Sequence, residues 1–369
     1  MIYLDHAAST PPRPEVRAAM APWLSEPGNP SSLHAAGRRA RRAVEDARER
    51  VAGRLRSDPK EIVFTSGATE ANALAILGAA EALREKGDHV VTTAIEHPSV
   101  LEAVARLERT GFRVTRVAPD AEGFVSAEAV AGAATPKTVL VSVMAVNNET
   151  GAVLPLEAIR RALPARVLLH TDAAQAVGRV PTGADVADLV TFSAHKIQGP
   201  KGVGGLRVRK GAALVPLWKG GGQEFERRAG TENVPGIVGL AEAMERAFAS
   251  LAEDVARQAA LRDRLEAGLG GTRNGPSAGR APHIVNVSFE GVDGEAAVLA
   301  LDAEGVCVSS GSACASGGTE PSHVLLAMGL PRSRAKAGLR FSLSPLTTES
   351  EIDGAVQAAR RVVERLRKR

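Results

Sequence analysis

The chain has 369 residues, which is long enough for one large domain or two medium domains with hydrophobic cores of their own. Aromatic residues make up only 3% of the composition, so aliphatic side chains must fill those cores. Lysine and arginine exceed aspartate and glutamate by only 46 to 42, and no aromatic residues are interleaved with the basic helical stretches, which argues against a nucleic-acid-binding protein.

The remaining composition also excludes several classes. The start, MIYLDHAAST, lacks the basic and apolar regions of a secretion signal, and no apolar run approaches the roughly 18 residues of a membrane span. Cys307 and Cys314 match neither a disulfide framework nor a structural zinc site. We therefore expect a cytoplasmic protein with free thiols, no metal and no membrane contact.

The first two thirds of the chain alternate between helical and strand-like patterns. Small apolar residues recur every three or four positions over 36–55, which predicts an amphipathic helix. A run at 206–208 follows its predecessor so closely, through a glycine turn, that it is the candidate for an antiparallel strand. The alternation predicts a parallel sheet covered by helices on both faces. Its strands are expected at 62–65, 90–93, 114–117, 139–143, 167–170 and 189–192.

A boundary is indicated late in the chain. A long helical stretch at 238–269 leads into 272–282, which is rich in glycine, proline and small polar residues. We expect a large domain over 14–251 and a small α/β domain formed by 1–13 with 252–369. Its expected elements are a strand at 283–289, a helix at 295–303, a glycine- and serine-rich loop, a strand at 339–343 and a helix at 352–367.

Ligands of open parallel sheets bind beyond the carboxyl ends of the strands, so the residues that follow each strand are the candidates for chemistry. After the first strand, SGATE (66–70) opens a helix. Gly67 lets the backbone approach a ligand, Thr69 is a cap-type residue, and free N–H groups at a helix start suit a phosphate. The alternative is a well-capped helix that needs no ligand.

Polar side chains also follow four other predicted strands. His97 is either functional or a helix-start histidine with a hydrogen-bonded ring. Asn148 lies in a stretch that could be an ordinary turn, and Asp172 could be a helix N-cap. Lys196 follows the strand at 189–192, where a solvated loop lysine is the commoner occurrence.

Together these groups suit one cofactor. The sequence contains no phosphate-loop motif and no GxGxxG fingerprint, and it also lacks HExxH and GxSxG. Pyridoxal phosphate needs a lysine for its aldehyde, a carboxylate beside its protonated ring nitrogen and donors for its phosphate. A lysine, a strand-end aspartate, a histidine and a glycine-flanked helix start therefore predict a pyridoxal-phosphate enzyme.

Seven motifs resemble the cysteine desulfurases, which belong to the class-V aminotransferase group of fold-type-I pyridoxal-phosphate enzymes. The motifs follow the family's order, and the resemblance runs from LDHAAST (4–10) to RFSLSPLTTESEID (340–353). It implies an α/β fold with a large, mostly parallel sheet and a smaller α/β domain. The motifs are GATEANALAI (67–76), EHPSV (96–100), VNNETG (146–151), TDAAQ (171–175), FSAHK (192–196), GGGQEFERRAGTEN (220–233) and SSGSACASG (309–317).

The resemblance implies a role for each matching residue. Lys196 forms the Schiff base with the cofactor and later removes the Cα proton of bound cysteine. Asp172 holds the proton on the ring nitrogen, and Gln175 meets the phenolic oxygen of the ring. His97 stacks on the ring and serves in acid–base steps, for which an unperturbed pKa of about 6.5 suits a histidine.

The same resemblance implies the contacts of the phosphate and of the substrate. Thr231 reaches the phosphate from the neighbouring subunit of a homodimer. Asn148 contacts the cofactor or the substrate, and Arg340 clamps the substrate carboxylate, because a guanidinium fork matches two carboxylate oxygens. The remaining phosphate neighbours are Ala68, Thr69, Ser193 and His195.

Cys314 distinguishes the expected reaction from other pyridoxal-phosphate chemistry. Its loop, about 309–318, is rich in glycine and small residues, so we expect it to be mobile and exposed. Cys307, between two valines, is expected to be structural. As a thiolate, Cys314 would take the substrate's sulfur as a persulfide, and alanine would leave. The chain resembles the family's SSGSAC type, but it stops soon after 352–367, whereas some longer relatives use a tail to engage an iron–sulfur scaffold.

The expected function is conversion of L-cysteine to L-alanine, with sulfur passing through Cys314 to an acceptor protein for iron–sulfur cluster assembly or thiolation. A selenocysteine lyase or another class-V aminotransferase-type enzyme is the first alternative, and it would need Lys196 but not Cys314. The second alternative is a non-catalytic scaffold, against which the presence of Lys196, Asp172 and His97 speaks.

Overall fold

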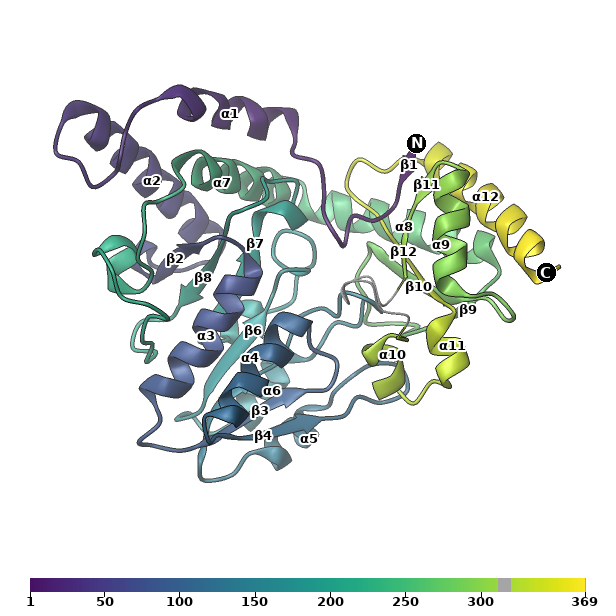
Figure 1. Cartoon of the computed structure of the whole chain (residues 1–369), viewed down its shortest axis with the longest axis horizontal. Helices are drawn as coiled ribbons and strands as arrows, with labels where there is room; N and C mark the ends of the chain where they lie inside the picture. The colour runs from purple at the N-terminus through teal and green to yellow at the C-terminus, as the bar shows by residue number, and fades with distance from the viewer. Residues whose placement is uncertain (311–319, 369) are drawn as a thin grey trace.

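The computed structural model describes residues 1–310 and 320–368 (Figure 1). It contains a large and a small sheet with helices packed against them, and β1 and β11 form a further two-stranded parallel pair. The large sheet has seven strands in the order β2-β8-β7-β6-β5-β3-β4. The predicted α/β class with a mostly parallel sheet is confirmed, since β3 to β7 pair in parallel. The strands are β2 (Ile62–Thr65), β3 (His89–Thr93), β4 (Arg113–Val117), β5 (Thr138–Ser142), β6 (Leu168–Asp172), β7 (Leu189–Ser193) and β8 (Gly204–Val208).

Helices cover both faces of this sheet, as the apolar strands require. Neighbouring strand residues enter opposite cores: Val90 packs with Leu74 and Val104, whereas Val91 belongs to the core on the other face. β8 runs antiparallel to both β2 and β7, which confirms the expectation for 206–208. One face carries α3 (Ala68–Ala82) and α4 (Pro98–Arg109), and the other carries α1 (Pro14–Ser25), α2 (Ala35–Arg54), α5 (Ala127–Ala133), α6 (Leu156–Ala162) and α7 (Val234–Ala249).

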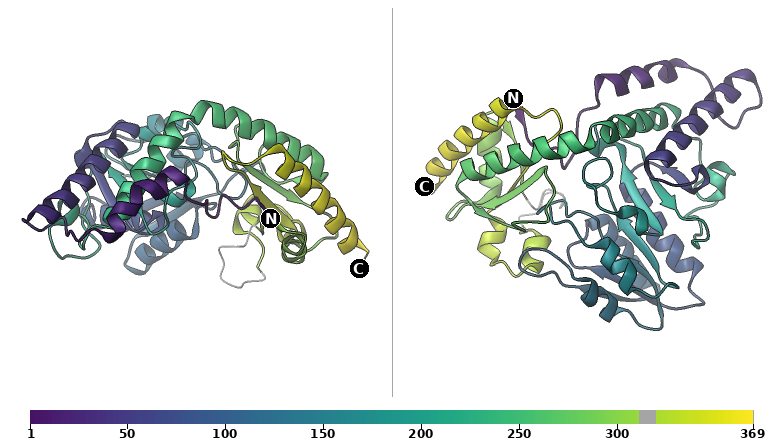
Figure 2. Two further views of the ribbon diagram at one scale, coloured as in Figure 1. Left: turned by 90° about the horizontal axis from the view of Figure 1, so that it is seen from above. Right: turned by 180° about the vertical axis from the view of Figure 1, so that it is seen from behind.

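The small sheet has the order β12-β13-β10-β9 and is antiparallel. It packs with α8, α9 and α12 around a separate core that includes Leu4, Leu265 and Phe341. Both termini lie beside it (Figure 2). The division into 14–251 and the remainder stays a prediction. The elements are β1 (Ile2–Tyr3), α8 (Leu251–Leu269), β9 (Thr272–Arg273), β10 (Ile284–Ser288), α9 (Gly294–Ala303), β11 (Val306–Cys307), β12 (Ser309–Ser310), α10 (His323–Ala327), α11 (Arg332–Lys336), β13 (Gly338–Ser342) and α12 (Glu349–Arg367).

Two local expectations were wrong. The stretch at 238–269 is two helices, because Ser250 leaves the helical conformation at φ −112° and ψ 11° and its hydroxyl bonds the Asp254 side chain. Thr69 does not cap α3. The helix begins at Ala68, and Gly67 precedes it with a φ of 155°, a conformation that glycine tolerates.

Among residues 1–310 and 320–368, no helix is long and apolar enough to cross a membrane. No group of three or more histidine, cysteine, aspartate or glutamate side chains in those ranges could hold a metal ion.

Candidate active site

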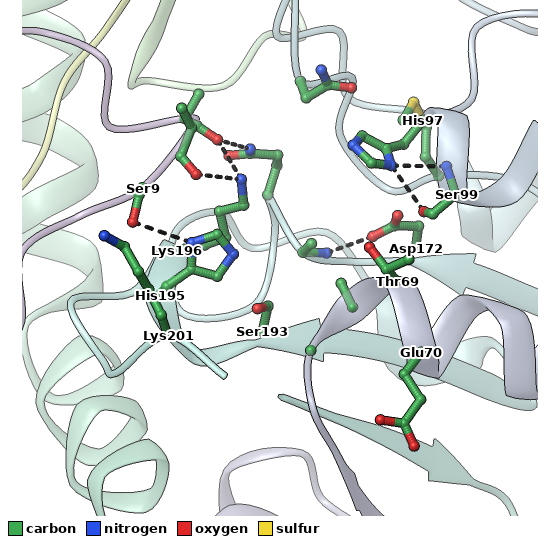
Figure 3. A pocket seen from close by; sticks show the side chains of 18 of the residues that line it. Ser9, Thr69, Glu70, His97, Ser99, Asp172, Ser193, His195, Lys196 and Lys201 are labelled. Carbon is green, nitrogen blue, oxygen red and sulfur yellow. Dashed lines mark hydrogen bonds between the residues drawn. The ribbon is translucent and has the colours of Figure 1, made fainter. Parts of the chain in front are cut away.

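A pocket of about 540 Å³ opens where the strands of the large sheet end. Its walls are the loops after β2, β3, β5, β6 and β7, together with residues 7–9 and one side chain of β13 (Figure 3). Parallel strands bring their carboxyl ends to one edge, so residues distant in sequence meet here. The predicted site residues that line it are Ala68, Thr69, His97, Asn148, Asp172, Gln175, Ser193, His195, Lys196 and Arg340.

Asp172 is the last residue of β6 and is 7% exposed. Its Oδ1 accepts a hydrogen bond from the Ala174 backbone N–H at 3.0 Å. Its Oδ2 accepts one from Asn72 Nδ2 at 2.7 Å. Two donors therefore fix the carboxylate at the floor of the pocket. Asn72 was not predicted as a site residue, because it lies in the second turn of α3 and reads from the sequence as an ordinary helical residue.

His97 lies across the pocket from Lys196 and is the N-cap of α4 (Figure 3). Its Nδ1 is 3.1 Å from the backbone nitrogen of Ser99 and 2.8 Å from the Ser99 hydroxyl. Burial lowers the pKa of His97, and the nearby Asp172 charge opposes this effect. The helix-start interpretation is thus correct, and the ring also lines the pocket.

Lys196 follows β7 in a short 3₁₀ turn, Ala194–Lys196. Its Nζ donates to the backbone oxygens of Ala7 at 2.6 Å and Ala8 at 2.9 Å. The residue before it, His195, shares a 3.3 Å hydrogen bond with Ser9. Burial lowers the pKa of His195 to about 4, and the charges of Lys196 and Lys201 add to this effect. The imidazole of His195 is therefore neutral at pH 7.

Gln175 and Arg340 complete the wall next to residues 7–9. Gln175 Nε2 donates to the Ala7 oxygen at 2.8 Å, and its Oε1 accepts from Arg179 at 3.0 Å. Arg340 is 4% exposed and donates to Asp5 at 2.9 Å and to the Asn148 backbone oxygen at 3.0 Å. The predicted substrate clamp is therefore already paired with a carboxylate. The sequence carried no local signal for these contacts of Asp5 and Arg179.

The pocket residues fit pyridoxal phosphate. The Ser193 hydroxyl is buried and has no hydrogen-bond partner within the described part of the chain, so it is available to an anion. The start of α3 lines the same pocket, and a Cβ added to Gly67 would meet no atom within 4 Å. Gly204 lets β8 pass close by, because a Cβ there would lie 2.8 Å from the Gly67 Cα. Helix N–H groups and a hydroxyl suit a phosphate, and Lys196 and Asp172 suit the aldehyde and the ring nitrogen.

One predicted residue within the described ranges lies apart from this pocket. Thr231 lines a neighbouring cavity of about 90 Å³, next to Ser66 and Gly202, and not the main pocket. Cys314 lies outside the described residues. The other cysteine, Cys307, is half-buried in β11.

Comparisons with known proteins show the family to which this chain belongs. The chain matches the family model of class-V aminotransferases over residues 2–354. It is 44% identical to the cysteine desulfurase IscS of Dictyoglomus turgidum over 375 residues, which cover 99% of this chain and 95% of that protein. It is similar in structure to a NifS-like protein, with a TM-score of 0.92, 37% identity and 99% of both chains covered. It is also similar to SspA, solved in complex with cysteine, with a TM-score of 0.81, 37% identity, and 94% of this chain and 100% of that chain covered. The chain therefore belongs to the aminotransferase class-V family and, within it, to the pyridoxal-phosphate-dependent cysteine desulfurases.

Proposed function

We propose that this protein is a cysteine desulfurase that converts L-cysteine to L-alanine and transfers the sulfur to Cys314. The observation that carries the proposal is the convergence of Lys196, Asp172 and His97 on one pocket that also offers a phosphate cradle. Relatives named cysteine desulfurase support the reaction, and the SspA complex with cysteine supports the substrate.

Pyridoxal phosphate supplies an electron sink that weakens the bonds at the substrate's Cα. The Asp172 carboxylate would face the ring nitrogen, and Asn72 and Ala174 keep it in place for that contact. The start of α3 with Thr69, Ser193 and His195 would hold the phosphate. Because His195 is neutral at pH 7, it would act there as a hydrogen-bonding group and not as a cation.

Lys196 and His97 would move the protons. The Ala7 and Ala8 carbonyls hold Lys196 Nζ on one side of the pocket, from which it would remove the Cα proton of the substrate. His97 stands on the opposite side as the second acid–base group. Arg340 would bind the substrate carboxylate through its guanidinium, which Asp5 and the Asn148 carbonyl orient.

The sulfur would leave through a cysteine thiolate. We propose that Cys314 Sγ attacks the sulfur of the bound substrate, so that an S–S bond forms as the substrate's C–S bond breaks. The electron pair of the broken bond stays with the carbon fragment. This fragment takes up one proton at Cβ and one at Cα, in place of the proton that Lys196 removed, and leaves as alanine. Cys314 keeps the persulfide and passes it to an acceptor protein in iron–sulfur cluster assembly or thiolation.

We further propose a homodimer in which Thr231 of one subunit reaches the phosphate in its partner. The placement of Thr231 outside its own main pocket supports this arrangement. A cytoplasmic location and the division into domains at 251 and 252 belong to the same proposal.

The test is turnover of L-cysteine in the presence of a reductant. The wild type should release alanine and sulfide in equal amounts, and Cys307→Ala should match it. Cys314→Ala should release neither while keeping the yellow colour of bound cofactor, and Lys196→Ala should also be inactive. If Cys314→Ala is as active as the wild type, Cys314 is not the acceptor and a lyase mechanism replaces the proposal. Transfer of amino groups to an added keto acid would instead favour an aminotransferase.

A further inference from the structure

Three hydrogen bonds link the strand-end carboxylate of the pocket to its histidine. Asn72 Nδ2 donates to Asp172 Oδ2 at 2.7 Å and to the Ser99 hydroxyl oxygen at 2.9 Å. The Ser99 hydroxyl in turn lies 2.8 Å from His97 Nδ1. Asn72 is fully buried. The function proposed above uses only its bond to Asp172, and it gives Ser99 no role.

The direction of each bond follows from which atoms carry protons. A backbone N–H can only donate, and that of Ser99 points at His97 Nδ1 from 3.1 Å, so Nδ1 must be the unprotonated, accepting nitrogen. A proton on Nδ1 would face this N–H directly. The Ser99 oxygen already receives an N–H from Asn72, so its own proton is free to go to Nδ1.

The orientation of the Asn72 amide is also determined. Reversing it would place Oδ1 against the Asp172 carboxylate, where two acceptors would repel each other without a proton between them. In the observed orientation Oδ1 is buried without a hydrogen-bond partner in the described residues. This unpaired oxygen costs less free energy than two acceptors placed against each other. Asp172 thereby sets the direction of Asn72, and Asn72 sets that of the Ser99 hydroxyl.

We propose that Asn72 and Ser99 are positioning residues that hold neutral His97 in the tautomer with its proton on Nε2. That nitrogen is turned away from Ser99 (Figure 3) and accepts no bond in the described structure. His97 therefore presents an Nε2–H to the pocket as a hydrogen-bond donor, while Lys196 is left as the base. This division of roles between His97 and Lys196 rests on the proposed function, but the tautomer itself does not.

The surroundings of His97 keep its ring neutral. A neutral ring carries one proton, and its tautomer decides which nitrogen holds it. Burial lowers its pKa, and the positive charges of Lys196 and Arg340 and the neighbouring His323 lower it further. The charge of Asp172 acts in the opposite direction. Since the ordinary histidine pKa is about 6.5, His97 is neutral at pH 7.

The tautomer can be read directly from the resting enzyme. Cofactor-loaded protein with ¹⁵N-labelled histidine is measured by NMR at pH 7.5 without substrate, and His97→Gln identifies the two signals of His97. We expect Nδ1 to have the shift of an unprotonated nitrogen and Nε2 that of a protonated one. The reverse pattern, or equal averaging of the two signals, would overturn the proposal. This result does not depend on turnover, so it stays separate from any failure of the desulfurase activity.

Variants then test which side chains are responsible. Ser99→Ala removes one of the two donors, and we expect Nδ1 to shift toward the value of a nitrogen without hydrogen bonds. Activity should fall about tenfold, as loss of one hydrogen bond predicts. Asn72→Ala should move Nδ1 in the same direction, because the Ser99 hydroxyl is then free to rotate. Ser99→Thr keeps a hydroxyl and should restore both the shift and the activity.

Ser9→Ala is the matched control. It also removes a serine hydroxyl from a histidine of this pocket, but the histidine is His195. The His97 signals should stay at their wild-type positions in this variant. An unchanged Nδ1 shift in Ser99→Ala, or the same shift in Ser9→Ala, would show that Ser99 does not position His97.

Discussion

At the scale of single residues, two charged groups of the pocket are held by neutral neighbours. Lys196 is held by two backbone carbonyls, and Asp172 by an amide side chain and a backbone N–H. Such partners orient an ionised group without cancelling its charge. Arg340 differs, because its partner Asp5 is charged. The substrate carboxylate would have to share the Arg340 guanidinium with Asp5.

Asp172→Asn tests the role of the carboxylate. Asparagine keeps the shape of the side chain and can still accept a hydrogen bond from the Ala174 N–H. It carries no negative charge, however, to stabilise a protonated ring nitrogen. We expect kcat for alanine formation to fall on the order of 100-fold, the usual effect of losing one electrostatic contact at a reaction centre. Cofactor content, read from visible absorbance, separates this effect from loss of binding.

Asp188→Asn is the control for that experiment. Asp188 is an aspartate whose ion pairs, with Arg160 and Arg209, lie outside the pocket. Its substitution should leave kcat near the wild-type value. A wild-type kcat in Asp172→Asn would show that the carboxylate does not support the chemistry.

At the scale of elements, one turn near the site is held in an unusual conformation. Glu224, Phe225 and Glu226 have φ values of 49°, 57° and 64°, the left-handed region that costs roughly 1–2 kcal/mol for each ordinary residue. Arg48 of α2 stabilises this turn: it forms an ion pair with Glu224 at 2.8 Å and lies over the Phe225 ring. The turn leads to Thr231, so we infer that Arg48 sets the start of the loop that carries it.

Arg48→Met should therefore destabilise the protein strongly. The side chains of Arg48 and Glu224 are 3% and 2% exposed, and removing one partner of a buried pair costs about 3–5 kcal/mol. Arg50 lies on the same helix and pairs with Glu242 at 38% exposure, so Arg50→Met should cost less than about 1 kcal/mol. Urea unfolding of the two variants measures the difference. Equal losses would contradict the role given to Arg48.

At the scale of the whole molecule, buried ionisable groups make stability depend on pH in two opposite ways. Burial lowers the pKa of His6, His170 and His195 to about 4, whereas the unfolded chain protonates them near 6.5. Acidification from pH 6.5 to 4 therefore favours the unfolded state.

Burial raises the pKa of Glu96 to about 8 and of Glu149 to about 7, from 4.5. Raising the pH from 4.5 to 8 ionises these carboxyls in the unfolded state first, and stability falls.

We expect the free energy of unfolding to be greatest near pH 6.5. Above this pH the histidines are neutral in the folded and unfolded states alike, and the carboxyls have not yet lowered the stability by their full amount. Glu96→Gln combined with Glu149→Gln should flatten the decline between pH 6.5 and 8, because an amide does not titrate. Denaturant unfolding across pH 4 to 9 measures both curves. A wild-type curve that keeps rising from pH 6.5 to 8 would contradict these shifts.

Much of this architecture was predictable because its signals are local. The strand at 62–65 has its predicted bounds, since all four residues are buried and Gly67 follows closely. The meeting of Lys196, Asp172 and His97 in one pocket was predictable because parallel strands bring their carboxyl ends to one edge of the sheet. The contacts of Lys196 with residues 7 and 8, and of Arg340 with Asp5, join segments far apart in sequence, and no local pattern records such pairs. The break at Ser250 was missed because apolar periodicity continues across it.

The measurement that tests the central claim most directly is a single turnover followed by mass spectrometry. Cofactor-loaded protein receives one equivalent of L-cysteine without reductant, and released alanine and the digested protein are analysed together. We predict equimolar alanine, a gain of one sulfur atom on the peptide that contains Cys314, and no gain on the peptide that contains Cys307. Lys196→Ala should give neither product. Alanine without added sulfur on Cys314 would contradict the proposed sulfur transfer, and absence of alanine would contradict the desulfurase activity itself.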